Sequence, residues 1–213
     1  MRILFFDTSC DFILVGLYSI NESQIIEDYF FAENLPREAS FRLISEIEKG
    51  LNAISLNKPD AIICCSGPGS FTGIRISVST ARNLSQIWEV PTLGLDTIEM
   101  YSTYYANFYK SPVIVCIDGK QKKVFAGYSD GKIYKGTFDI TPNEIETIFQ
   151  NEYSYSKIIS DTGLIKHHDL LSHLPNPFAL IEQKLSIIRN LNLPSNDYSS
   201  LLPKYMRETY ASK

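Results

Sequence analysis

Two places in this chain, 111 residues apart, follow the same order of apolar strand, acidic residue, tight turn and second strand. The first apolar run ends in Asp7 and its counterpart ends in Asp118. A glycine lies inside the next apolar stretch of each copy, at Gly16 and at Gly127. An internal repeat constrains the architecture more than any single motif does. It predicts two related lobes, although two ordinary hairpins would give the same pattern.

Apolar runs of strand length alternate with helical patterns along the chain, which predicts an α/β fold. We expect an N-terminal lobe over residues 1–109 and a smaller C-terminal lobe over residues 110–213. The expected strands are Ile3–Phe6, Phe12–Tyr18, Gln24–Phe31, Ala61–Cys65, Thr92–Leu95, Ile114–Ile117, Val124–Ser129, Ile133–Phe138 and Lys157–Ser160. The expected helices are Arg37–Asn52, Phe71–Glu89, Thr97–Phe108, Pro142–Phe149 and Phe178–Asn190, followed by an extended tail from Asn192 to Lys213.

A glycine-rich block, Gly67-Pro68-Gly69-Ser70-Phe71-Thr72-Gly73-Ile74-Arg75-Ile76, joins one of these strands to the start of a long helix. The free N–H groups and the positive dipole end of a helix N-terminus favour an anion such as phosphate. No Lys-Ser/Thr pair follows the glycines, so the block is not a nucleotide-binding P-loop. Turn geometry alone would also explain the glycines, and the two interpretations remain equal.

The two acidic turns are the other candidates for phosphate or cation contacts. A carboxylate at a strand exit can hold a cation or its water while turn amides meet a phosphate. It can also simply cap its own turn. Two facing turns would clamp one phosphate chain between the lobes. The candidate phosphate or nucleotide contacts are Asp7, Thr8, Gly67, Gly69, Ser70, Asp118 and Gly119.

The helix after the glycine block has an apolar and small-residue arc that is wider than one core-facing stripe requires. We therefore expect one face to cover a sheet and another to contact a partner, although burial between two internal layers would give the same arc. The expected partner-contacting residues are Ile74, Ser77, Val78, Thr80, Ala81 and Leu84.

Composition excludes several function classes. The chain has 213 residues, is 44% hydrophobic and 21% charged, and carries a formal net charge of -4. An acidic chain is a poor autonomous nucleic-acid binder. Its four cysteines include no CxxC pair, and we find neither a signal-peptide core nor a membrane-length run. We therefore expect a reduced, cytoplasmic protein.

Catalytic signals are weak. The three histidines, His167, His168 and His173, have no cysteine nearby, and we interpret them as surface residues rather than metal ligands. No nucleophile, base and orienting acid assemble in the sequence. We expect no catalytic residues and no metal site in this chain.

The same motifs resemble those of the TsaB (YeaZ) family. They are Ile3-Leu4-Phe5-Phe6-Asp7-Thr8-Ser9, the block Gly67–Arg75, Ile117-Asp118-Gly119 and Pro203-Lys204-Tyr205-Met206-Arg207. The resemblance implies an actin-like, Hsp70-like (ASKHA) fold of two related lobes, each with a mixed β-sheet flanked by helices. It also implies a subunit of the bacterial complex that forms N6-threonylcarbamoyladenosine at adenosine 37 of tRNAs reading ANN codons.

In that family the paralogue TsaD carries the metal and performs the transfer, and the ATPase TsaE joins the complex. The resemblance implies a non-catalytic partner of TsaD that also forms homodimers and meets tRNA only through the complex. ATP and metal are then expected on the partner subunits, with no cofactor held firmly by this chain. One departure from the family is Ala39-Ser40, where His-Ser is usual.

The alternative is a stand-alone nucleotide-binding phosphotransferase or ATPase of the same fold, which the paired acidic turns favour. Nucleotide sites in this fold class usually have a Gly-Gly adenosine loop, and this chain has no Gly-Gly pair. The sequence therefore favours the partner subunit over the enzyme.

Overall fold

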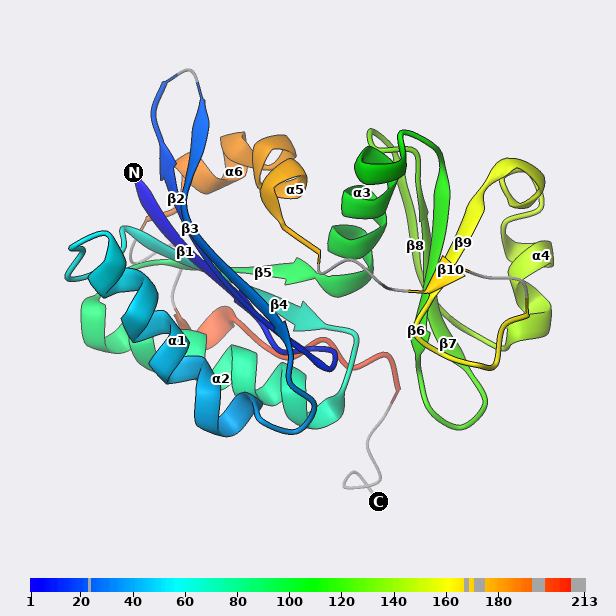
Figure 1. Cartoon of the computed structure of the whole chain (residues 1–213), viewed down its shortest axis with the longest axis horizontal. Coiled ribbons are helices and arrows are strands. Elements are labelled where there is room, and N and C mark those ends of the chain that lie inside the picture. The colour runs from blue at the N-terminus through cyan, green and yellow to red at the C-terminus, as the bar shows by residue number, and fades with distance from the viewer. Residues whose placement is uncertain (23, 167–168, 171–174, 193–197, 208–213) are drawn as a thin grey trace. The chain divides into compact units, whose positions relative to one another are not determined.

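The computed structural model describes residues 1–22, 24–166, 169–170, 175–192 and 198–207. Its contacts divide the chain into two compact units (Figure 1). The first unit comprises Met1–Leu95 and Ile181–Lys204, and the second comprises Asp96–Leu180 and Tyr205–Lys213. This division differs from the expected one at residue 109, because α3 (Thr97–Tyr109) packs on the second sheet and a late segment returns to the first unit.

Each unit contains one mixed five-stranded sheet, and the two sheets have the same topology. The first has the order β3-β2-β1-β4-β5 and the second the order β8-β7-β6-β9-β10. In both, a central strand pairs antiparallel with the next strand along the chain and parallel with the fourth strand of its unit. Asp7 and Asp118 are the last residues of the two central strands. The predicted repeat is therefore a repeat of structure.

In the first unit, the antiparallel hairpins precede two helices that pack on the sheet. The order is β1 (Arg2–Asp7), β2 (Phe12–Ile20), β3 (Ile25–Asn34), α1 (Ala39–Ala53), β4 (Ala61–Gly67), α2 (Phe71–Trp88) and β5 (Thr92–Asp96), joined later by α6 (Leu185–Arg189) and the 3-10 turn η3 (Tyr198–Ser200).

In the second unit, α3 packs on strands β6 to β8. The order is β6 (Val113–Asp118), β7 (Val124–Ser129), β8 (Tyr134–Ile140), η1 (Pro142–Glu144), α4 (Ile145–Ile148), η2 (Tyr153–Tyr155), β9 (Lys157–Ser160) and β10 (Asp169–Leu170), and α5 (Phe178–Gln183) spans the return to the first unit.

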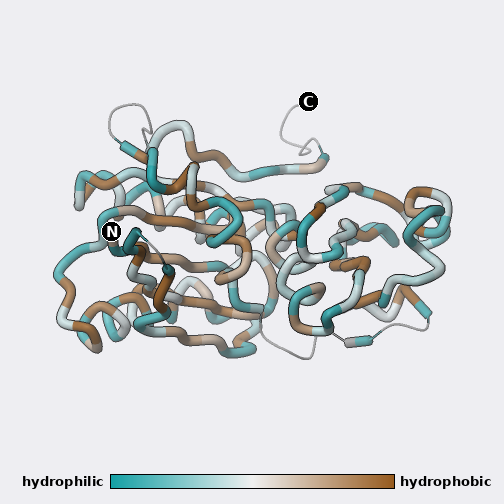
Figure 2. Tube along the Cα trace, turned by 90° about the horizontal axis from the view of Figure 1, so that it is seen from above, coloured by the Kyte–Doolittle hydropathy of each residue, from teal (hydrophilic) through white to brown (hydrophobic). Residues whose placement is uncertain are grey.

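The core of the first unit lies between its sheet and the helices α1 and α2. Alternate strand residues point to this side, as the pleat requires. They meet helix residues spaced three and four apart. The cluster contains Leu4, Phe6, Val15, Leu17, Leu43, Ile47, Ile62, Val78, Ala81 and Leu201, among others. Figure 2 shows the hydrophobic stretches of the tube in the interior of this unit, with hydrophilic ones at its loops.

The structure differs from the expected elements chiefly after residue 140. The expected helix over 178–190 is divided into two short helices. The first, α5, ends at Gln183, and Lys184 is the N-cap of the second, α6. The expected extended tail contains η3 and runs on to Arg207, and the rest of it falls outside the described residues. The three histidines also lie outside them.

Candidate functional site

The turn after β1 is closed by Asp7 itself. The side chain is 1% exposed, and its Oδ1 accepts a hydrogen bond from the Ser9 amide at 2.7 Å. This is the turn-capping geometry of an aspartate two residues before a donor. Asp7 therefore shapes the β1–β2 turn, which is the role that the simpler interpretation gave it.

Thr8 connects this turn to the first turn of α2. Its hydroxyl donates to the carbonyl oxygen of Gly73 at 2.8 Å and lies 3.1 Å from the Ser77 hydroxyl. Its amide donates to Ser77 Oγ at 3.2 Å. All three interactions are buried, so each polar group has the partner that burial requires.

Two glycines make this close approach possible. A Cβ added to Gly73 would lie 1.9 Å from the Thr8 carbonyl oxygen, and one on Gly69 would lie 2.3 Å from that of Ser9. Between them, the Ser70 amide donates to the Ser9 carbonyl at 2.7 Å, and the Ser70 hydroxyl caps α2 by accepting from the Gly73 amide at 3.4 Å. The start of α2 therefore packs directly on the backbone of the β1–β2 turn.

The first glycine of the block has a different neighbour. Gly67 has a φ of +114°, and a Cβ there would meet the Lys204 carbonyl oxygen at 2.8 Å. The Lys204 amide in turn donates to the Ser66 carbonyl at 2.7 Å. Each of these three glycines thus has a packing reason of its own, and phosphate binding at this block stays a prediction.

The matching turn of the second unit is built differently. Asp118 accepts from the Lys120 amide at 2.8 Å and from its ammonium at 2.6 Å. Burial alone would raise the pKa of Asp118, but these hydrogen bonds from Lys120 outweigh it and lower the pKa. The Gly119 amide donates to the Lys123 carbonyl. The two turns belong to different units, so their joint contact with one phosphate chain also stays a prediction.

The expected partner face of α2 requires a correction. Ile74, Ser77, Val78 and Ala81 are each no more than 2% exposed. They are covered within their own unit, because α2 lies on β4 and β1 with this side inward. A side chain with no free surface offers nothing to a partner. Thr80 and Leu84 are half-buried, and their contact with a partner stays a prediction.

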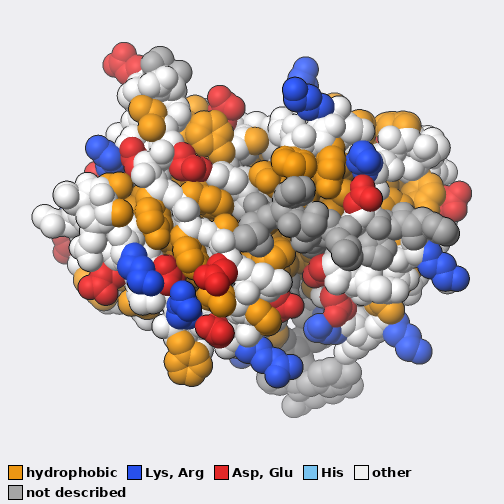
Figure 3. All heavy atoms as spheres, in the orientation of Figure 1, with side chains coloured by type: hydrophobic (Ala, Val, Ile, Leu, Met, Phe, Trp, Pro, Cys, Tyr) orange, Lys and Arg blue, Asp and Glu red, His pale blue; other side chains and the backbone are white. Residues whose placement is uncertain are grey.

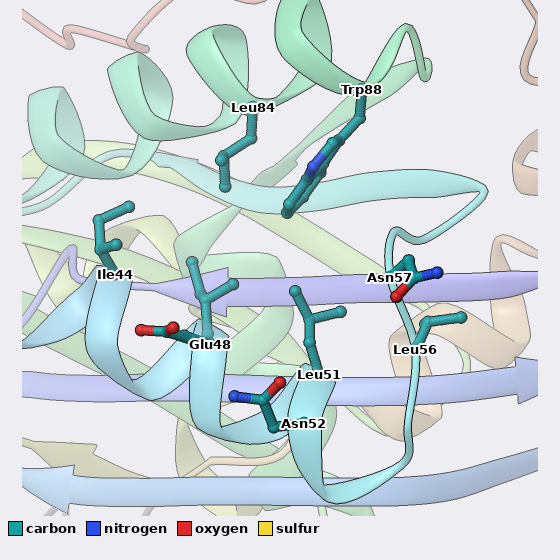
Figure 4. A pocket seen from close by; sticks show the side chains of 9 residues that line it. Ile44, Glu48, Leu51, Asn52, Leu56, Asn57, Leu84 and Trp88 are labelled. Atoms are coloured by element: carbon teal, nitrogen blue, oxygen red, sulfur yellow. The ribbon is translucent and has the colours of Figure 1, made fainter.

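A groove opens instead between α1 and α2, with a volume of about 270 Å³. In Figure 4, Ile44 and Leu51 of α1 lie opposite Leu84 and Trp88 of α2, and the loop after α1 closes one end. Glu48, Asn52 and Asn57 supply its polar edge. The Lys58 ammonium donates to the Trp88 carbonyl at 2.9 Å.

The two helices that form this groove also carry exposed apolar side chains, one of which, Ile44, lines the groove. Phe41 is 84% exposed, Ile44 54% and Ile87 72%. Phe41 and Ile44 are three apart on α1, as Leu84 and Ile87 are on α2, so each pair lies on one side of its helix. In Figure 3, hydrophobic side chains reach the surface of the first unit among charged ones. Amphipathic periodicity can mark a face of a helix as apolar, but it cannot show that the outer part of that face is left uncovered.

A charged network lies on another face of α1. Glu46 is 1% exposed, and its Oε1 accepts from Arg42 at 2.9 Å and from Lys49 at 2.8 Å. Burial alone would raise the pKa of Glu46, but the hydrogen bonds from Lys49 and Arg42 outweigh it and lower the pKa. The apolar groove and this network therefore give α1 two distinct sides.

Other chemistry is sparse in the described part of the chain. No three His, Cys, Asp or Glu side chains among the described residues are placed to hold a metal ion. Over the same residues, no helix combines the length and apolarity needed to cross a membrane. Cys64 and Cys116 are fully buried in β4 and β6. Burial raises the pKa of both thiols, with a further contribution from Asp7 at Cys64 and from Asp161 at Cys116.

Comparisons with known proteins match this chain to one family model and to several relatives. The family model described as "TsaD: tRNA N6-adenosine threonylcarbamoyltransferase" matches residues 33–193. Three proteins named "tRNA threonylcarbamoyladenosine biosynthesis protein TsaB" are similar. That of Buchnera aphidicola subsp. Schizaphis graminum is 32% identical over 59% of this chain and 59% of the relative. That of subsp. Acyrthosiphon pisum is 30% identical over 70% and 75%, and that of Escherichia coli K12 is 30% identical over 59% and 53%. The match thus spans little more than half of two of these relatives.

Among solved structures, "YeaZ from Pseudomonas aeruginosa" superposes with a TM-score of 0.73. The superposition covers 96% of this chain and 99% of that chain, at 20% identity. At that identity, the superposition shows a shared fold and nothing beyond it.

Proposed function

This chain belongs to the TsaB (YeaZ) family, and from that premise we propose that it is the non-catalytic partner of TsaD. The complex they form would make N6-threonylcarbamoyladenosine at adenosine 37 of tRNAs reading ANN codons. TsaE would supply ATPase activity, tRNA would be met only through the complex, and the assembly would work in the cytoplasm. The predicted actin-like fold of two related units is confirmed.

One observation carries the proposal, namely the groove between α1 and α2, together with the exposed side chains of Phe41, Ile44 and Ile87 on the same two helices. Exposed apolar patches of this kind mark interaction surfaces. A groove between two helices suits an apolar helix of a partner, whose side chains would insert three and four apart. A partner with the same fold, such as TsaD or a second copy of this chain, would bring such helices.

The β1–β2 turn supports a non-catalytic role. The start of α2, where an anion would be bound, is in contact with the backbone of Thr8 and Ser9. Catalysis in the complex is therefore assigned to TsaD, and the contribution of this chain is to hold TsaD in its active arrangement.

The function is tested by reconstitution. TsaD, TsaE, tRNA, ATP and threonylcarbamoyl-adenylate, the group donor that the family resemblance implies, are incubated with and without this chain. Modified adenosine is then measured by mass spectrometry of the digested tRNA. We expect modification only when this chain is present. Equal modification without it would overturn the proposal.

The surface is tested by two charge substitutions, Ile87→Glu and Phe41→Glu. Both side chains are exposed, so the fold should survive while the buried charge prevents docking. We expect co-purification with TsaD to be lost and tRNA modification to fall at least tenfold. The matched control is Ile133→Glu, since Ile133 is 64% exposed on the other unit. Unchanged co-purification of both variants would show that TsaD binds elsewhere.

Calorimetry with ATP and magnesium separates this function from the stand-alone enzyme. We expect no tight binding by the isolated chain. Tight binding that Asp7→Asn abolishes, in a variant shown to be folded, would instead support a nucleotide site at the β1–β2 turn.

A further inference from the structure

The turn between β6 and β7 has an unusual backbone. Three consecutive non-glycine residues have positive φ values, namely Lys120 (61°), Gln121 (54°) and Lys122 (61°). Side chains with a Cβ rarely adopt this left-handed conformation, because Cβ approaches the following carbonyl oxygen. A run of three requires interactions that outweigh its cost.

The bonds within the turn are short-range ones. The Lys120 amide donates to Asp118 Oδ1 at 2.8 Å, and the amides of Gly119 and Lys123 each form a backbone bond of 3.0 Å inside the turn. Such bonds fix the ends of the turn. None of these three bonds involves Gln121, the middle residue of the run.

Gln121 is contacted by Arg207, 86 positions further along the chain. Its Nη1 donates to Gln121 Oε1 at 3.4 Å, and its guanidinium lies 5.6 Å from the centre of the Phe125 ring on β7. Its Nη2 is also 3.2 Å from the place where a Cβ on Gly119 would lie. One side chain therefore touches the turn on two sides.

Arg207 is itself anchored to the sheet. Its Nε and Nη2 donate to the two carboxylate oxygens of Asp139 on β8. The side chains of Arg207 and Asp139 are 27% and 13% exposed. The Lys123 ammonium lies 3.7 Å from the same carboxylate. A paired fork of this kind is among the most directional ion pairs in proteins, so it fixes the guanidinium against the turn.

We propose that Arg207 is a conformational strap, meaning a side chain from a distant segment that holds the β6–β7 turn in its left-handed form. Asp139 anchors the strap to β8, and Gln121 and Phe125 are the groups it holds. Residues 120–122 keep their positive φ values only while the guanidinium is in place.

The test is hydrogen exchange of the full-length chain with Arg207→Ala. We expect the amides of Gly119 and Lys123 to exchange roughly five- to thirtyfold faster, the range that the loss of one or two kcal/mol gives. Amides in the middle of β6 and β7 should keep their rates. Arg207→Lys, which keeps the charge but not the fork, should also release the turn.

The matched control is Lys157→Ala, which removes a 3.6 Å ion pair with Asp169 in the same unit. It should leave the turn amides unchanged. Unaltered exchange at Gly119 and Lys123 in Arg207→Ala would overturn the strap. So would an equal acceleration throughout β6 and β7, because it would indicate general stabilisation only. If Arg207→Ala does not fold, Asp139→Asn removes the anchor and is judged by the same two outcomes.

Discussion

Among single residues, Gly73 shows most directly how the glycine block works. It lies in the first turn of a helix, where alanine would normally be the better residue by about 1 kcal/mol. Glycine is needed here because the Thr8 carbonyl occupies the space of a Cβ, only 1.9 Å from where that atom would lie. The fold of the first unit depends on that contact between turn and helix.

Gly73→Ala is therefore expected to destabilise the protein. Overpacking against backbone costs about 1–3 kcal/mol, since a carbonyl cannot rotate away as a side chain can. The control is Gly163→Ala, because a Cβ at Gly163 would meet nothing within 4 Å. Urea unfolding should show a lower free energy of unfolding for Gly73→Ala alone. Equal stability of the two variants would contradict the packing explanation.

Glu46 gives the protein a pH dependence of predictable sign. Its pKa in the folded state lies below the ordinary value of 4.5. The stabilisation from its carboxylate is therefore fully present above about pH 4.5, and it is lost as the pH falls through the folded-state pKa.

Glu46→Gln removes that contribution to the pH dependence. Chemical unfolding at several pH values from 6 to 3 should give a shallower loss of stability for Glu46→Gln than for the natural chain. Identical slopes would show that Arg42 and Lys49 do not stabilise the carboxylate.

At the scale of elements, helices α2 and α3 begin with caps of different strength. Asp96 accepts from the amides of Ile98 and Glu99 at 2.8 and 3.0 Å, and its other oxygen accepts from the Thr137 hydroxyl of β8 at 2.7 Å. Ser70 accepts one amide at 3.4 Å. The start of α2 relies on Thr8 more than on its cap.

Asp96→Ala should therefore lower the free energy of unfolding more than Ser70→Ala does. We expect a loss of about 1–2 kcal/mol for Asp96→Ala and about 0.5 kcal/mol for Ser70→Ala. Asp96→Asn, which can still cap, should lie between the natural chain and Asp96→Ala. Thermal and urea unfolding of the three variants give the ranking. A larger loss for Ser70→Ala would contradict it.

The sequence predicted most of these elements because their signals are local. Buried strands such as Val124–Ser129 were found to the residue, since apolar runs bounded by turn residues are a strong pattern. The spacing of Asp7 and Asp118 predicted the repeat. The side of α2 that is buried could not be predicted, because it depends on how the helix lies across β4 and the more distant strand β1. The groove was likewise missed, since periodicity marks a face as apolar without showing what covers it.

At the scale of the whole molecule, the first unit is discontinuous in sequence, since the second unit is inserted between its two segments. Residues 181–204 return to the first unit, and Leu201, 7% exposed, belongs to the core cluster of α1, α2 and their sheet. The stability of the first unit therefore depends on residues that follow the second.

Leu201→Ala should destabilise the first unit by about 2–5 kcal/mol, the usual cost of a cavity in a packed core. Its neighbour Leu202 is 63% exposed, so Leu202→Ala is the matched control and should be nearly neutral. Hydrogen exchange should quicken in β1 and β4 more than in β6 and β7. A uniform change in both sheets would mean that the two units unfold together.

The sealed thiols of Cys64 and Cys116 have a practical consequence. Each lies in a different sheet, where burial keeps the thiol protonated and inaccessible to reagents. An alkylating agent can attack either sulfur only during a transient opening of the surrounding strands. The alkylation rates of Cys64 and Cys116 therefore report separately on the opening of the two units, and comparing them shows which unit opens more readily.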